Sequence, residues 1–184
     1  MPLNPAAAVA GGVLGDTGHD AANEDAPAYA LIELLFFAYR DFVGDPDRIL
    51  AEYGFGRAHH RVLHFVDRHP GLTIAELLDI LRITKQSLNR VLKELVEKGF
   101  VEQRAGTTDR RQRLLTCTVS GRELAARLAL VQTRRVRRAL AGQRPEVREA
   151  AQRFLLAMVD PGDRGEVDRL VAGGIADQST GPGA

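Results

Sequence analysis

The sequence predicts a mainly α-helical domain with a small β-hairpin, and three features of the chain carry this prediction. Two short amphipathic helical segments lie close together between residues 72 and 99. Two strand-like runs joined by a polar loop follow directly, and further helical segments stand on both sides of this unit. This order of elements predicts a winged helix-turn-helix with N-terminal and C-terminal dimerisation helices.

The first short helix begins after Thr73, a good N-cap residue, and Glu76 three positions later completes a capping box. Its apolar positions share one helical face and are Ile74, Leu77, Leu78 and Leu81. Arg82 and Ile83 then form the predicted turn into the next helix.

The second short helix starts at a further capping signal, Thr84 or Ser87, and ends at Gly99. Leu88, Val91, Leu92 and Leu95 recur at the spacing of one helical face. The opposite face carries side chains of the types that hydrogen-bond to base edges and phosphates in a major groove. The predicted DNA contacts on this helix are Thr84, Lys85, Gln86, Ser87, Asn89, Arg90 and Lys93.

Two short strands are expected after this helix, over residues 100–104 and 113–119. The loop between them, residues 105–112, is polar and contains Gly106, which favours a turn. The pair is therefore predicted to form the β-hairpin that serves as the wing.

The remaining helices are predicted from apolar periodicity and breakers. A segment over residues 29–43 is apolar around its whole circumference, so more than one of its faces must be covered, and Gly44-Asp45-Pro46 is predicted to end it. Further helices are expected over residues 57–68, 120–140 and 145–159, with a last helical turn at 166–171.

The length of 184 residues suits one well-packed domain, over residues 28–171. Within it we assign 28–44 and 121–171 to dimerisation helices and 57–120 to the winged helix-turn-helix. Residues 1–27 and 172–184 lack periodicity and are expected to be disordered tails, the first of them acidic. No long apolar run or basic leader is present, so a cytoplasmic protein is expected.

Positive charge is concentrated on the predicted DNA-binding segment. Residues 82–113 contain nine Lys and Arg against four Asp and Glu, whereas residues 1–27 contain four acids and no Lys or Arg. The net charge of the whole chain is only +1. A basic segment that coincides with a helix-turn-helix pattern favours nucleic acid as the partner.

Several motifs together resemble the multiple-antibiotic-resistance regulator (MarR) family. Asp109-Arg110-Arg111, followed at the family's spacing by residues 117–121 (CTVSG), is similar to its wing signature, with Cys117 where that family usually has Leu. Residues 61–63 (RVL), 73–77 (TIAEL), 84–87 (TKQS) and 95–101 (LVEKGFV) also resemble its core. The likeness covers roughly residues 29–159, and it is specific because several motifs occur in the right order.

This resemblance implies an obligate homodimer that binds a pseudo-palindromic operator. We expect it to act as a repressor. The helix over residues 84–98 would lie in the major groove, and Arg110 and Arg111 would reach the adjacent minor groove. Asp109 is close enough in sequence to orient the Arg111 guanidinium, or else it is an ordinary turn residue. Arg113 is expected to contact solvent or a phosphate.

Members of this family usually sense a small acidic or phenolic ligand between the dimerisation helices and the DNA-binding lobe. The candidate lining residues here are Phe36, Phe37, Arg40, His60 and His64. His60 and His64 share a helical face beside His59, a spacing that also suits a metal-responsive or haem-responsive regulator. The simpler interpretation is that these histidines fill the junction between lobes, and no cofactor or metal is expected.

Other readings of the chain are weaker. A protein-interaction module would need an apolar or acidic outward face on the helix after Thr84, and no phosphate loop, nucleophile elbow or metalloprotease motif indicates an enzyme. The single cysteine, Cys117, excludes an internal disulfide and is expected to pack inertly. The cluster Arg134, Arg135, Arg137 and Arg138 is expected to be solvated, with phosphate contact or pairing to the acidic tail as alternatives.

Overall fold

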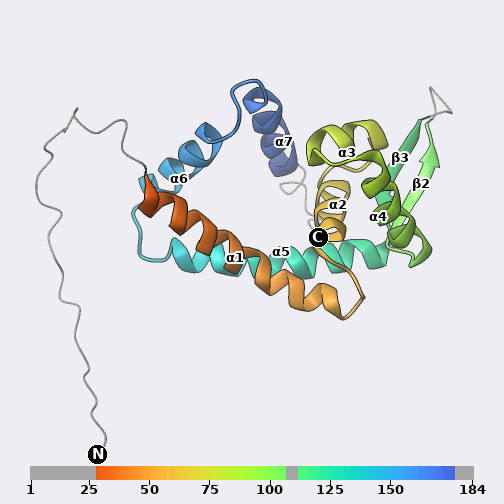
Figure 1. Ribbon diagram of the computed structural model, residues 1–184, viewed down its shortest axis with the longest axis horizontal. Coiled ribbons are helices and arrows are strands. Elements are labelled where there is room, and N and C mark those ends of the chain that lie inside the picture. The colour runs from red at the N-terminus through yellow and green to blue at the C-terminus, as the bar shows by residue number, and fades with distance from the viewer. Residues whose placement is uncertain (1–27, 107–111, 177–184) are drawn as a thin grey trace, which may run out of the picture.

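The computed structural model describes residues 28–106 and 112–176. Helices α1 (Tyr29–Ala51) and α5 (Val119–Ala139) run alongside one another along the molecule (Figure 1). A lobe at one end contains α2 (Arg57–Arg68), α3 (Ile74–Leu81), α4 (Lys85–Glu97) and the hairpin of β2 (Val101–Ala105) and β3 (Arg113–Cys117). Helices α6 (Pro145–Ala157) and α7 (Arg164–Ala176) turn back toward this lobe, so that α7 lies beside α3. The predicted fold class, mainly helical with a small wing hairpin, is confirmed.

The core of the lobe is formed by apolar side chains that α2, α3, α4, β3 and α5 direct toward one another. Its fully buried members include Val62, Leu63, Leu77, Leu88, Leu92, Leu95, Leu115, Leu124 and Leu128. The apolar faces predicted for α3 and α4 contribute to this core, which therefore fixes both helices of the helix-turn-helix.

A third strand, β1 (Leu72–Thr73), joins the hairpin to give an antiparallel sheet of order β1-β3-β2. Leu72 pairs with Leu115, and Val101 pairs with Cys117. Strand β1 was not predicted, because two residues are too few for an alternating pattern. The same Thr73 caps α3, where its hydroxyl oxygen accepts from the Glu76 N–H, as the capping box predicted.

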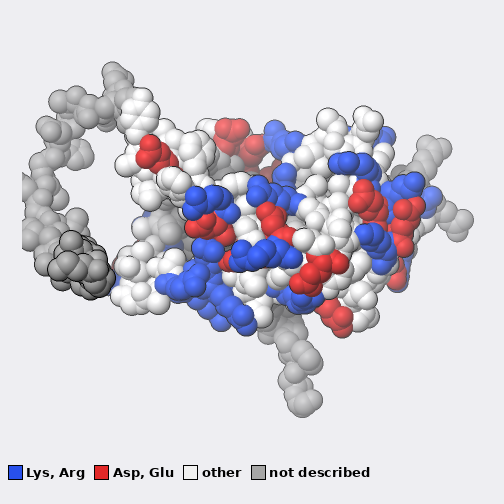
Figure 2. All heavy atoms as spheres, turned by 60° about the horizontal axis from the view of Figure 1, so that its bottom comes forward, with Lys and Arg blue, Asp and Glu red and all other residues white. Residues whose placement is uncertain are grey.

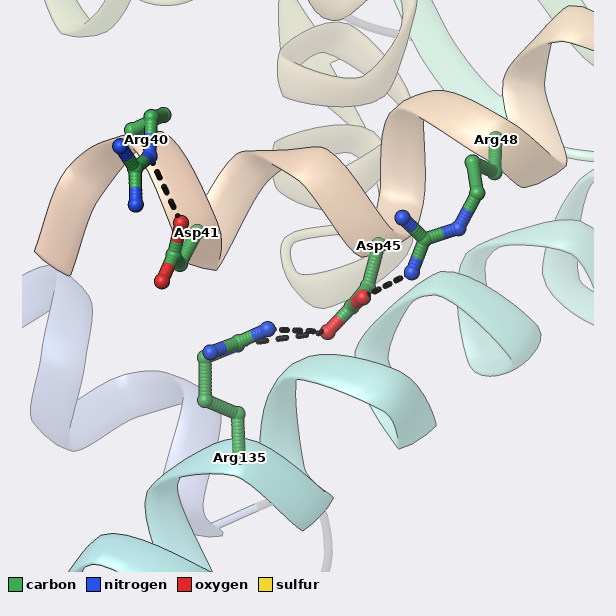
Figure 3. A network of polar contacts seen from close by, with 5 residues as sticks. All are labelled: Arg40, Asp41, Asp45, Arg48 and Arg135. Carbon is green, nitrogen blue, oxygen red and sulfur yellow. Dashed lines mark hydrogen bonds and ion pairs between the residues drawn. The ribbon is translucent and has the colours of Figure 1, made fainter. Parts of the chain in front are cut away.

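The predicted end of the first helix at Val43 is wrong, since α1 continues through Pro46 to Ala51. Val43, Pro46 and Leu50 are buried on one face, and this burial offsets the backbone hydrogen bond that a proline cannot donate. Asp45 also ties this part of α1 to α5, because its carboxylate accepts two hydrogen bonds from Arg135, at 2.8 and 3.3 Å (Figure 3).

The predicted C-terminal tail begins too early. Helix α7 extends from Arg164 to Ala176, so the expected boundary at residue 172 falls inside a helix. Val167 and Leu170 are half-buried at helical spacing, which supports a longer helix than a single turn. Residues 1–27 and 177–184 lie outside the described residues. Among the helices that the structure describes, none is long and apolar enough to cross a membrane.

Candidate nucleic-acid interface

Helix α4 presents the predicted DNA-contact residues on its outer side. Its N-cap is Thr84, whose hydroxyl oxygen accepts from the Ser87 N–H at 3.2 Å, which settles the choice between the two predicted caps. The seven predicted residues from Thr84 to Lys93 are all exposed, whereas Leu88, Val91, Leu92 and Leu95 are buried. The helix therefore has one face held by the core and one face free to contact a partner.

The outer side chains are little engaged within the protein. Lys93 lies 3.7 Å from the Glu97 carboxylate, a weak pair of exposed groups. Arg113, at the start of β3, is also exposed. The predicted wing residues Asp109, Arg110 and Arg111 lie outside the described residues.

Three polar contacts fix α4 and the turn before it. Arg61 of α2 donates to the Leu81 carbonyl at 2.7 Å and so caps the end of α3. The ring of His59 lies between α2 and α4, where Nδ1 accepts from the Gly56 N–H at 3.1 Å and Nε2 is 2.9 Å from the Glu94 carboxylate. Because Nδ1 accepts, Nε2 carries the proton and donates to Glu94.

His59, which the sequence analysis placed only beside His60 and His64, is a structural link between α2 and α4. It is only 9% exposed and stacks on Phe55 with ring centroids 4.6 Å apart. The sequence carried a weak signal for its role, since His59 stands three residues after the Gly56 N-cap. Its contact with Glu94 lies 35 residues away in the chain and could not be read from spacing.

The start of α5 is locked to the base of the hairpin. Thr118 donates its hydroxyl to the Gly99 carbonyl at 2.7 Å and accepts from the Gly121 N–H at 3.0 Å. Gly121 is buried so closely that a Cβ there would lie 2.0 Å from the Phe100 carbonyl oxygen. These contacts give a physical reason for the Thr-x-x-Gly spacing in this segment.

Cys117 is buried beside this junction, with its sulfur 3.9 Å from the Leu63 carbonyl oxygen. Burial raises the pKa of its thiol to about 12. The thiol is therefore neutral at physiological pH, as expected for inert packing.

A hollow of about 390 Å³ lies between α1, α2 and α5. His60 and His64 line it together with Tyr39, Phe42 and Val43. Desolvation lowers the pKa of His60, and it lowers that of His64 to about 4 with the help of nearby positive groups. Both rings are therefore neutral near pH 7.

The other predicted pocket residues, Phe36, Phe37 and Arg40, are not among the residues that line this hollow. Phe36 is 70% exposed and Phe37 is 55% exposed, and Arg40 pairs with the adjacent Asp41 carboxylate at 2.8 Å (Figure 3). The residues of α1 that do line the hollow are Tyr39, Phe42 and Val43, which are close to Arg40 in the sequence. No group of three or more potential metal ligands occurs among the described residues.

The arginine cluster on α5 has two different environments. Arg135 is held by Asp45, and this hydrogen bond is the main reason that the pKa of the Asp45 carboxyl lies below its usual value. Arg134, Arg137 and Arg138 are exposed. Figure 2 shows Lys and Arg side chains gathered on the face along α1 and α5, with acidic side chains among them.

Comparison with known proteins identifies the protein family to which this chain belongs. A family model described as the MarR family matches residues 53–112. The HTH-type transcriptional regulator PetP of Rhodobacter capsulatus is 47% identical over 133 residues, which cover 72% of this chain and 80% of PetP. The chain belongs to the MarR family of transcriptional regulators, which are DNA-binding proteins and not enzymes.

Solved structures of this family share the fold. Streptococcus pneumoniae FabT in complex with DNA has a TM-score of 0.63 at 17% identity, over 72% of this chain and 94% of FabT. Mycobacterium tuberculosis Rv2887, in complex with p-aminosalicylic acid, has a TM-score of 0.51 at 26% identity, over 73% of this chain and all of that one. Rv2887 is also named as a transcriptional repressor.

Proposed function

We propose that this protein is a homodimeric repressor that recognises a pseudo-palindromic operator with one α4 helix in each half-site. The observation that carries the proposal is the two-sided character of α4, whose predicted contact residues are all exposed while its apolar face is buried. A helix held in this way can enter a major groove as a rigid unit. Such a regulator works on chromosomal DNA, and we therefore place it in the cytoplasm.

Sequence preference would come from the amide and guanidinium groups of α4. Gln86 and Asn89 have the shape to pair with adenine, and Arg90 has the shape to pair with guanine. Lys85 and Lys93 would contact phosphates, as would Arg113 on the wing strand. Arg110 and Arg111 would enter the minor groove, with Asp109 orienting Arg111.

The dimer is supported by apolar side chains that a single chain leaves open to water. On α1 they are Tyr29, Leu31, Ile32, Leu34, Phe36, Phe37 and Tyr39, and on α6 and its C-cap they are Phe154, Leu155 and Met158. Helix α6 has no buried residue at all. A surface of this kind is stable in water when a second copy covers it.

An effector would act through the hollow that His60 and His64 line. Its volume of about 390 Å³ is in the range of small-molecule sites, and it lies where the dimerisation helices meet the lobe. A ligand there would change the spacing of the two lobes and release the operator. The complex of Rv2887 with p-aminosalicylic acid supports a small aromatic acid as the first compound to test.

Alanine substitutions on α4 test the proposal. The unaltered protein is used to select a duplex from a random pool, and binding is then measured on this duplex and on a random duplex of equal length. Gln86→Ala, Asn89→Ala and Arg90→Ala should each weaken the binding free energy for the selected duplex by about 1 to 3 kcal/mol. Each should weaken binding to the random duplex by less. Gln143→Ala, an exposed amide between α5 and α6, is the matched control and should change neither. Equal losses on both duplexes would show that α4 does not read sequence.

A further inference from the structure

The turn between α3 and α4 has an unusual backbone. Arg82 has φ of 51°, and among the described residues it is the one residue other than glycine with positive φ. A residue with a side chain adopts this left-handed conformation at an energetic cost, so neighbouring contacts must hold it there. Thr84, the cap of the helix proposed to read DNA, follows two residues later.

Two of the contacts that hold this turn come from the lobe itself. The Arg82 N–H donates to the Leu78 carbonyl at 2.9 Å, and Arg61 donates to the Leu81 carbonyl at 2.7 Å. A third contact comes from a distant part of the chain. The Arg82 guanidinium donates to the Asp163 carboxylate at 2.5 Å, across 81 residues.

Asp163 is itself firmly placed. It directly precedes α7, and its backbone carbonyl accepts from the Glu166 and Val167 N–H groups in the first turn of that helix. The next residue, Arg164, donates to the Ala157 and Val159 carbonyls and so closes the corner between α6 and α7. The carboxylate that meets Arg82 therefore projects from a fixed corner.

The rest of α7 stands off the lobe. A hollow of about 460 Å³ separates it from α2 and α3, with Phe65 and Ile80 on one side and Val167 and Leu170 on the other. Apolar side chains thus leave space between α7 and the lobe, and the Arg82–Asp163 pair supplies a direct polar contact between the start of α7 and the lobe.

We propose that Asp163 is a positioning residue for DNA recognition, because it holds the Arg82 turn and thereby sets the N-terminal end of α4. The C-terminal helix is thus joined to the DNA-reading unit of its own chain. This inference rests on the proposed role of α4. The pair is partly exposed, with 69% of the Arg82 side chain and 33% of the Asp163 side chain accessible, so its effect is moderate in size.

The sign of one substitution separates positioning from simple electrostatics. Asp163→Asn removes a negative charge, which by itself strengthens binding to polyanionic DNA. Positioning predicts the opposite, a loss of about two- to fivefold on the selected duplex, the range that an exposed ion pair supplies. Asp168→Asn, on an exposed position of α7, makes the same charge change and should not weaken binding.

Hydrogen exchange of the backbone amides of residues 82–86, measured without DNA, supplies the second readout. Asp163→Asn should accelerate this exchange, and a charge-exchanged variant, Arg82→Asp with Asp163→Arg, should slow it again. Tighter or unchanged DNA binding by Asp163→Asn overturns the proposal, and so does weaker binding with unchanged exchange. If the unaltered protein selects no duplex, the proposed function fails, while the exchange data still decide whether Asp163 fixes the turn.

Discussion

Gly121→Ala is a direct test of the junction between α5 and the wing. An alanine Cβ at this position would lie 2.0 Å from the Phe100 carbonyl oxygen and 3.2 Å from the Cys117 Cβ. Ordinary contacts between carbon and oxygen are about 3.3 Å or longer, so the two backbones must separate by more than about 1 Å. The Phe100 carbonyl also accepts from the Thr118 N–H at 3.1 Å, and this hydrogen bond is strained by the same movement.

The expected loss of stability follows from three opposing contributions. Overpacking of a tight contact costs about 1 to 3 kcal/mol, and weakening one hydrogen bond adds about 1 kcal/mol. Alanine gains back about 1 kcal/mol of helix propensity over glycine. The net loss is about 1 to 3 kcal/mol, which lowers the melting temperature of a domain of this size by roughly 2 to 12 °C.

Thermal unfolding followed by circular dichroism measures this effect. Gly165→Ala is the matched control, because this glycine is also helical and a Cβ there would meet nothing within 4 Å. The control should be as stable as the parent protein or slightly more so. A Gly121→Ala variant that melts at or above the parent temperature would refute the assignment of Gly121 as a close-contact residue.

Three further predictions concern single side chains. Arg61→Ala should lower the free energy of unfolding by about 1 kcal/mol, because it removes the donor to the Leu81 carbonyl. An unchanged midpoint of unfolding by denaturant would count against this cap. Cys117 should react with iodoacetamide at pH 8 at least about a hundredfold more slowly in the native protein than in urea, because its pKa is about 12; equal rates would contradict its burial. Between about pH 4 and 6.5 the unfolded chain binds a proton at His64 that the folded chain does not, so the free energy of unfolding should fall as the pH is lowered through this range. This fall should be shallower in His64→Gln. The difference between the two proteins should be smaller than the full pKa shift of His64 implies, because the side chain keeps contact with solvent. Identical pH profiles would argue against the lowered pKa.

The elements with strong local signals were predicted well. The capping box at Thr73, the Thr84 cap and the apolar face of α4 depend on neighbours three or four residues apart, and such patterns are visible in sequence. The whole of α2 was predicted at its observed bounds for the same reason.

The errors arose where distant residues override a local signal. Pro46 is a helix breaker by itself, but burial beside α5 and the Asp45–Arg135 pair keep α1 helical through it. His59 stands beside the candidate pocket residues in the sequence, yet its ring faces Glu94 on α4. The Arg82–Asp163 contact joins residues 81 apart, and no spacing rule could have predicted it.

Sequencing of the duplexes selected by the unaltered protein tests the central claim most directly. A dimer that places one α4 helix in each half-site predicts an enriched inverted repeat, with half-site centres about one helical turn, roughly 10 base pairs, apart. Alanine at Asn89 should then relax the preference at one base of each half-site. A selected pool without an inverted repeat, or with no enrichment over the starting pool, would contradict the account.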